Sequence, residues 1–241
     1  MYGVRNVLTP YNPRLATPSK HGPSFGSPAL VLFPTELERQ RFADRGGLPL
    51  GLAIQKICGF GPVAAAARTA QLIEKLKPAR VVLCGIAGTY DDATYPVGSA
   101  AVFGEVAIDG VGAGQGEDHL LPPALGFPQW PGSEDTQVDP IELSLRLATG
   151  RDDTGPLLLT TCAASISEDE VRLRLERFPT AVAEDMEGFA VAMACALART
   201  PLTIVRGFSN LVGDRDSRNW RIPSALFAAR EKALAFLEQA S

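Results

Sequence analysis

Histidine is scarce in this chain, since its 241 residues include only His21 and His119. A serine–histidine–aspartate triad, or a zinc site built on several histidines, therefore has few residues to use. The four cysteines lie far apart and form no C-x-x-C pair: Cys58, Cys84, Cys162 and Cys195. This pattern predicts inert thiols in a reducing compartment and no zinc site. We expect chemistry on carboxylates, amides and hydroxyls, without a metal or organic cofactor.

An excess of basic charge is also missing, as are long apolar runs and a secretory leader. The formal net charge is −4, which argues against a general nucleic-acid binder because phosphate-driven binding needs a basic surface. No apolar run reaches membrane-spanning length, and no N-terminal segment combines the charged, apolar and cleavage regions of a signal peptide. We expect a cytoplasmic protein with no nucleic-acid or membrane partner.

The composition is that of a globular protein, with 46% hydrophobic and 21% charged residues. Residues 1–28 mix proline, glycine and serine without periodicity, so we expect a flexible N-terminal extension outside the fold. Residues 29–241 are expected to form one domain. Strand-like and helix-like segments alternate there, which predicts an α/β fold with a mixed central sheet.

The expected strands and helices follow from apolar runs and from proline and glycine signals. Strands are predicted at 29–33, 50–58, 81–88, 99–108, 157–161 and 202–205. Helices are predicted at 62–77, 167–177, 186–198 and 222–237, with a further helix after the first strand. Residues 109–140 are rich in glycine and proline. A stretch of this kind is either a functional loop or lid, or a surface insertion.

The most informative stretch is 184–216, which joins a helix to a strand and carries polar residues in both. Acidic residues crowd the predicted helix start, and the predicted strand 202–205 ends in the sequence RGFSN (206–210). Ligands in open α/β sheets bind outside the carboxyl ends of the strands, where this cluster is expected. Taken singly, Glu187 could be a first-turn carboxylate, and Asn210 a turn residue.

Two motifs in this stretch carry a family resemblance. The sequence MEGFA (186–190) is followed by RGFSNLVGDRDSRNW (206–220). Together they resemble the nucleoside phosphorylase/hydrolase superfamily, and within it the futalosine hydrolases. The resemblance extends from about residue 29 to the C-terminus. It implies a single-domain three-layer sandwich, with a mixed central β-sheet flanked by helices, that binds a purine nucleoside.

In the superfamily the Met-Glu pair holds the ribose. The resemblance therefore implies that Glu187 accepts hydrogen bonds from the ribose hydroxyls and that Met186 packs on the sugar. Phe189 belongs to the same motif and is expected at the substrate site.

The purine base of the substrate is expected to contact Ser209 and Asn210. An asparagine cannot serve as a titrating acid, but its amide can donate to a carbonyl at purine position six and accept from a protonated N7. This pattern fits a hypoxanthine-type base, whereas an aspartate suits 6-aminopurines. Ser209 would hold Asn210 in orientation.

Glu38 has two competing interpretations. Thr35-x-x-Glu38 is a capping-box pattern, in which the glutamate bonds the backbone at the helix start. The resemblance instead implies a general base that activates water. Arg206 would orient that water or Glu38, although a structural ion pair is the alternative for this arginine.

The run GIAG (85–88) is predicted to end its strand in a glycine turn, where Ala87 and Gly88 let a nucleoside approach the backbone. Phosphorylases of the superfamily place an arginine and a serine around this strand end to bind phosphate. The matching positions here are Leu83 and Ile86, neither of which can pair with an anion. Water is therefore the expected nucleophile.

The resemblance thus implies an N-ribosidase that hydrolyses futalosine to hypoxanthine and dehypoxanthine futalosine in menaquinone biosynthesis. Two other enzymes remain as alternatives, a methylthioadenosine/S-adenosylhomocysteine nucleosidase and a purine nucleoside phosphorylase. A nucleoside-binding module without turnover is the alternative outside enzymes. The resemblance also implies a homo-oligomer, with a dimer as the minimum.

Overall fold

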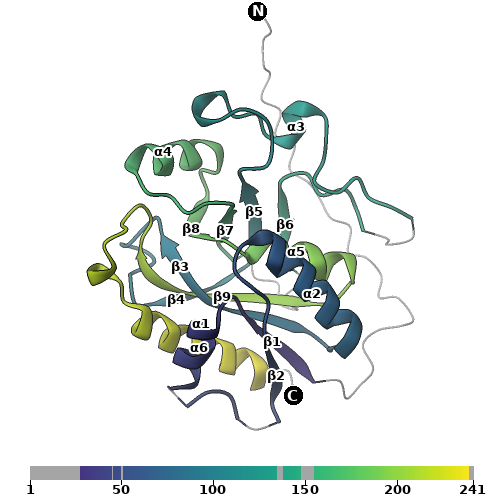
Figure 1. Cartoon of the computed structure of the whole chain (residues 1–241), viewed down its shortest axis with the longest axis vertical. Coiled ribbons are helices and arrows are strands. Elements are labelled where there is room, and N and C mark those ends of the chain that lie inside the picture. Colours follow the sequence, from purple (N-terminus) through teal and green to yellow (C-terminus); the bar gives the residue numbers. More distant parts are fainter. Residues whose placement is uncertain (1–27, 45, 50, 135–137, 148–154, 239–241) are drawn as a thin grey trace, which may run out of the picture.

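The computed structural model describes residues 28–44, 46–49, 51–134, 138–147 and 155–238 (Figure 1). The predicted N-terminal extension, residues 1–28, lies outside these residues except for Pro28. Within the described part, no helix is both long and apolar enough to cross a membrane.

A mixed sheet of nine strands forms the centre of the described structure. Its main path runs β2-β1-β3-β8-β7-β5-β6, and β9 pairs with β3 and β4. Five of the pairings are parallel, and three, β3 with β8, β4 with β9 and β5 with β6, are antiparallel. The strands are β1 (Ala29–Phe33), β2 (Ala53–Ile57), β3 (Val81–Thr89), β4 (Ala100–Phe103), β5 (Glu105–Asp109), β6 (Ser144–Arg146), β7 (Leu157–Thr161), β8 (Ala181–Asp185) and β9 (Leu202–Leu211).

Helices cover both faces of this sheet, which confirms the predicted three-layer α/β architecture (Figure 1). Alternate residues of β1 separate the two cores, because successive side chains of a strand point to opposite faces. Leu30 and Leu32 join the core that includes α2 and α5, whereas Val31 and Phe33 join the core that includes α1 and α6. The helices are α1 (Glu36–Ala43), α2 (Pro62–Leu76), α3 (Pro122–Leu125), α4 (Glu168–Arg177), α5 (Gly188–Leu197) and α6 (Ile222–Glu238).

Three sequence-based boundaries differ from the structure around the sheet. The predicted strand 99–108 is divided into β4 and β5 at Gly104, which packs so closely on Gly155 that a Cβ atom at Gly104 would lie 2.3 Å from the Gly155 nitrogen. The GIAG run is not a turn, since β3 continues through it to Thr89. Likewise β9 continues to Leu211, so Arg206 and Asn210 lie within the strand rather than after it.

The strand β8 differs from the sequence-based expectation, in which Glu184 and Asp185 belong to a helix start. Both acids are buried in the strand, and α5 begins only at Gly188. Isolated buried carboxylates are costly, so such residues normally argue against a core strand. Here Glu184 is paired with Arg174, and Asp185 is paired with Arg206.

The glycine- and proline-rich segment 109–140 is partly ordered into short elements. Its described part holds the 3₁₀ turn Gly116–Asp118, the helix α3 and three isolated β-bridges. It is therefore not a structureless loop. None of the described residues of this segment lines the cavity found at the predicted site.

Candidate active site

Three strands meet at the predicted site, and Gly88 is the residue they share. In β3, Gly88 lies opposite Glu184 of β8 on one side and opposite Asn210 of β9 on the other. The β3–β9 register shifts here, since Ala87 pairs with Phe208 and the next residue pairs with Asn210. Ser209 is thus the extra residue of a β-bulge, a feature that re-aims neighbouring side chains.

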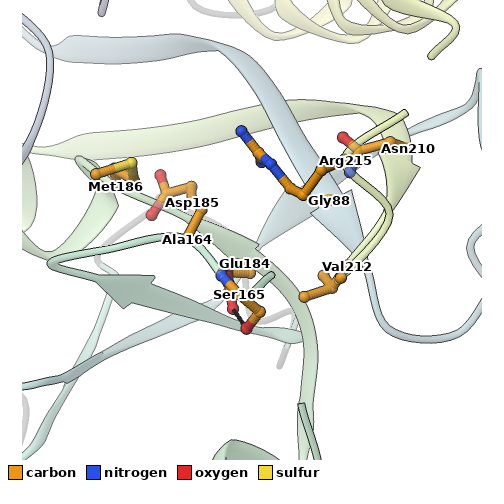
Figure 2. A pocket seen from close by; sticks show the side chains of 10 residues that line it. Gly88, Ala164, Ser165, Glu184, Asp185, Met186, Asn210, Val212 and Arg215 are labelled. Atoms are coloured by element: carbon orange, nitrogen blue, oxygen red, sulfur yellow. Dashed lines mark hydrogen bonds between the residues drawn. The ribbon is translucent and has the colours of Figure 1, made fainter. Parts of the chain in front are cut away.

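A cavity opens where these strands meet (Figure 2). It encloses about 320 Å³ of empty space, part of it open to solvent. Of the nine predicted site residues, Gly88, Met186 and Asn210 line it. The complete lining consists of Gly88, Ala164, Ser165, Glu184, Asp185, Met186, Asn210, Val212, Gly213 and Arg215.

Arg206 is fully buried behind the cavity and is held by two carboxylates. Its Nε and Nη2 donate to Asp185 Oδ2 at 3.0 and 2.5 Å, and Nη2 also donates to Glu187 Oε2 at 3.2 Å. The structural ion pair considered for Arg206 is therefore present, with Asp185 as its unpredicted partner. Burial disfavours the charged guanidinium, but the surrounding carboxylates outweigh it and raise the pKa of Arg206.

Glu187 is the N-terminal flanking residue of α5 and is almost completely buried. Its Oε1 accepts a hydrogen bond from the Gly61 backbone N–H at 2.9 Å, at the start of α2. Burial raises the pKa of Glu187 to about 7, opposed by the charge of Arg206 and reinforced by that of Asp185. A carboxylate with such a pKa changes its charge near neutral pH.

Glu38 caps its helix, as the sequence pattern predicted. Its Oε2 accepts hydrogen bonds from the Thr35 N–H at 3.0 Å and the Thr35 hydroxyl at 2.6 Å, and the Glu38 N–H donates to the Thr35 hydroxyl. Glu38 is nevertheless buried, and its Oε1 reaches across to accept from the Ile86 N–H at 3.0 Å. Each carboxylate oxygen thus faces a different element.

Gly85 brings Glu38 and Arg206 to one place. A Cβ atom at Gly85 would lie 2.6 Å from Glu38 Oε1 and would overlap Arg206 Nη1. Within the described residues, Arg206 Nη1 is buried and has no hydrogen-bond partner. Buried donors are rarely left unpaired in proteins. The geometry therefore leaves one buried donor for a small polar molecule, such as water, close to the Glu38 carboxylate.

The Asn210 side chain is fixed by its neighbours. Its Oδ1 faces the Ser209 hydroxyl at 2.7 Å, while its Nδ2 donates to the carbonyl oxygens of Leu211 at 2.7 Å and Asp214 at 3.4 Å. The reverse amide orientation would set an oxygen against these two carbonyls, so the assignment follows from the hydrogen-bond network. In this conformation, both Nδ2 hydrogens are used by the protein's own backbone.

Three other predicted residues lie beside the cavity without lining it. The Ser209 hydroxyl also approaches the carbonyl oxygen of Ala87 at 3.2 Å, so it is placed between Ala87 and Asn210. Ala87 is itself buried. Phe189 places its side chain in the core below α5, and its N–H donates to the Thr160 hydroxyl. None of the three lines the cavity, so their contact with a substrate stays a prediction.

One wall of the cavity rests on a polar network that sequence reasoning missed. Glu184 accepts hydrogen bonds from the Ser165 N–H and hydroxyl, both at 2.8 Å (Figure 2). It also accepts from the Tyr90 hydroxyl and from Arg174 Nη1, both at 2.7 Å. Arg174 and Arg177 in turn bind Asp109. The alternation in AVAED (181–185) could have indicated a strand, but nothing in the sequence pairs Glu184 with Arg174.

Comparisons with known proteins agree with this architecture. Residues 53–240 match the family model described as the phosphorylase superfamily. The chain is 34% identical over 175 residues to a futalosine hydrolase from Streptomyces coelicolor, covering 70% of this chain and 72% of that protein. It is also 34% identical over 167 residues to a 5′-methylthioadenosine/S-adenosylhomocysteine nucleosidase from Colwellia psychrerythraea, covering 64% and 65%.

A solved structure shows the same fold. The nucleosidase of Colwellia psychrerythraea in complex with adenine superposes with a TM-score of 0.67 at 22% identity, covering 88% of this chain and 95% of that one. The family model spans most of the described sheet and all helices from α2 to α6. The chain therefore belongs to the phosphorylase superfamily.

Proposed function

We propose that this protein is an N-ribosidase that hydrolyses futalosine, releasing hypoxanthine, and that it serves menaquinone biosynthesis. The observation that carries the proposal is the unpaired, buried Arg206 Nη1 beside Glu38 Oε1. A water molecule bonded to both groups would be oriented by the guanidinium and deprotonated by the carboxylate. The similarity to a futalosine hydrolase supports the choice of substrate.

In the proposed reaction, water attacks the anomeric carbon of the ribose. Glu38 takes a proton from the water, whose oxygen forms the new bond to the sugar. The electron pair of the broken glycosidic bond leaves with the purine, which takes up a proton from solvent at N7, and Glu38 then returns its proton to solvent. Glu187 lies next to Arg206 and would accept hydrogen bonds from the ribose hydroxyls while favouring positive charge on the ring. Met186 would pack against the sugar.

The base would occupy the cavity between Gly88 and Asn210. One lone pair of Asn210 Oδ1 remains free beside the Ser209 contact and would accept from N7–H of the leaving base. For its Nδ2 to donate to the purine carbonyl, the bonds to Leu211 and Asp214 would have to open. Asparagine at this position supports a hypoxanthine-type base.

A second candidate function is a methylthioadenosine/S-adenosylhomocysteine nucleosidase, because several similar relatives carry that name. Asn210 counts against it, since a 6-aminopurine is better served by an acid. A phosphorylase is disfavoured by Leu83, which is buried in the core, and by Ile86, whose N–H is bonded to Glu38. Neither side chain can hold a phosphate.

The first experiment is to measure base release from futalosine, inosine and methylthioadenosine, each with and without phosphate. We expect phosphate-independent hypoxanthine release from futalosine. Adenine release from methylthioadenosine would instead favour the second candidate, and a requirement for phosphate would favour a phosphorylase. Binding without turnover of any substrate would leave a nucleoside-binding module.

A pair of variants separates the two roles of Glu38. Glu38→Gln is expected to abolish hydrolysis while substrate still binds, because the amide cannot accept the water's proton. Thr35→Ala removes the other half of the capping box and leaves the carboxylate in place. It should lower the free energy of unfolding by about 1 kcal/mol and retain turnover. If Glu38→Gln hydrolyses futalosine at the wild-type rate, Glu38 is only a cap.

A further inference from the structure

The acidic side chains of the cavity have no acceptor capacity left for a ligand. A carboxylate offers about four acceptor positions. Glu184 uses four, for Tyr90, Arg174 and two donors of Ser165. Asp185 also accepts four hydrogen bonds, which come from the Thr160 hydroxyl, the Gly188 N–H and two nitrogens of Arg206.

Arg215, by contrast, is a cation in the cavity lining whose hydrogen-bond donors are available to a ligand. Among the described residues, no carboxylate or hydrogen-bond acceptor holds its guanidinium. Its side chain is exposed and stacks over Trp220, with Cζ 5.0 Å from the ring centroid. Trp220 is itself held by a hydrogen bond from Nε1 to the Asp214 carbonyl at 3.2 Å. In Figure 2 the Arg215 side chain extends into the space between the Asn210 and Asp185 sides of the cavity.

We infer that Arg215 is a specificity-determining residue that donates hydrogen bonds to acceptor atoms of the bound base, so that the cavity selects 6-oxopurines over 6-aminopurines. This inference rests on the proposed function, in which the base occupies this cavity. It differs from the Asn210 argument, because both Nδ2 hydrogens of Asn210 are bonded to backbone carbonyls and Arg215 needs no rearrangement to donate. Stacking on Trp220 holds the planar guanidinium in place.

The selectivity follows from the hydrogen-bond inventory. A carbonyl at purine position six would accept from Arg215, and a charge-assisted bond of this kind is stronger than a neutral one. A 6-amino group would present donors to a guanidinium that is also only a donor, and both acids of the lining are saturated. We expect the 6-oxo substrate to be preferred by about 10- to 100-fold in kcat/KM.

The test compares futalosine with its 6-amino counterpart, which differs only at position six. In the wild type, futalosine is expected to be the better substrate. Arg215→Met should lower kcat/KM for futalosine by about 10- to 100-fold and change that of the 6-amino compound by less than about threefold, so that the preference disappears. Arg215→Lys should retain part of the preference, since it keeps a donor without the planar stacking group.

Arg218→Met is the matched control, because Arg218 lies in the same segment but is exposed and paired with Asp216. It should keep the wild-type preference. An equal loss on both substrates, or an unchanged ratio, in Arg215→Met would overturn the inference.

A second measurement separates this inference from the proposed function. Binding of free hypoxanthine and adenine is followed by tryptophan fluorescence, since Trp220 stacks against Arg215. We expect tighter binding of hypoxanthine by the wild type and no such difference in Arg215→Met. If futalosine is not hydrolysed but this pattern holds, the proposed function fails and the role of Arg215 stands. Equal binding of the two bases by the wild type, or binding of neither, would overturn the role of Arg215.

Discussion

Two opposing effects act on the charge of the Glu187 carboxylate. The side chain is buried, which favours its neutral form, yet it accepts hydrogen bonds from Arg206 and Gly61, which favour the charged form. Burial prevails, and the pKa of Glu187 is raised to about 7. The stability of the fold near neutral pH therefore depends on the protonation state of this residue.

The raised pKa predicts a pH-dependent stability. The folded protein binds the Glu187 proton more tightly than the unfolded chain does, so this stabilisation is complete below about pH 4.5 and is lost as the pH rises towards 7. Between these limits we expect Glu187 to lower the wild-type free energy of unfolding by about 1 to 3 kcal/mol. Denaturant titrations at several pH values measure this slope.

Glu187→Gln should remove this part of the pH dependence, because glutamine does not titrate. Glu142→Gln, at an exposed position, serves as the control and should retain the wild-type slope. A Glu187→Gln variant whose stability varies with pH as the wild type does would contradict the prediction.

For single residues, the sequence was a better guide to which of them lie at the site than to their contact partners. The capping role of Glu38 could be predicted, because a capping box is a local pattern of four residues. The pairing of Arg206 with Asp185 could not, since it joins β9 to β8, which lie on opposite sides of β3, through residues 21 positions apart. The roles of Glu38, Arg206 and Asn210 in catalysis stay predictions.

Among the elements, β3 carries the tightest constraint. At Gly85 any larger side chain would displace both the Glu38 carboxylate and the Arg206 guanidinium. Gly85→Ala is expected to cost about 1 to 3 kcal/mol of stability through overpacking and to abolish turnover by the molecules that still fold. Thermal unfolding and futalosine hydrolysis measure the two effects.

Gly207→Ala provides the comparison, because its Cβ would overlap the Ala225 carbonyl of α6 instead. That variant should lose stability while its folded fraction retains turnover. Wild-type turnover in Gly85→Ala would show that Glu38 and Arg206 tolerate displacement.

The helix α4 is attached to the sheet by a buried charge. Arg174 binds Asp109 of β5 and Glu184 of β8. Arg174→Met leaves Glu184 buried without its cation, for which we expect a loss of about 3 to 5 kcal/mol. Denaturant unfolding measures this loss in the free energy of unfolding.

Arg172→Met is the control. It removes an arginine from the exposed side of the same helix, where Arg172 pairs with Glu176, and it should change stability by less than about 1 kcal/mol. Equal losses in the two variants would refute the anchoring role.

The alternation of apolar and helical segments was sufficient to predict most elements. It failed where an element depends on distant partners. The strand β6 pairs with β5 across about 40 residues, and β8 is a strand because arginines from α4 and β9 compensate its acids. Gly104 interrupts a single apolar run because another chain segment, at Gly155, packs against it.

For the whole molecule, we propose that residues 29–241 form one catalytic domain. The first strand begins at Ala29, and the family match covers residues 53–240. A chain starting at Pro28 is therefore expected to have the midpoint temperature of unfolding and the hydrolytic rate of the full chain. A lower midpoint temperature, with the full chain measured alongside, would mean that residues 1–27 belong to the folded unit.

The hydrogen bonds of Asn210 also limit how the substrate preference of this enzyme could change in evolution. An Asn210→Asp substitution, considered alone, would place a carboxylate oxygen against the carbonyl oxygens of Leu211 and Asp214, where the amide now donates. A descendant with aspartate at this position would therefore have to rebuild the segment after β9 as well as exchange one residue. Asn210→Asp alone is therefore expected to lower stability, because two hydrogen bonds become contacts between like-charged oxygen atoms.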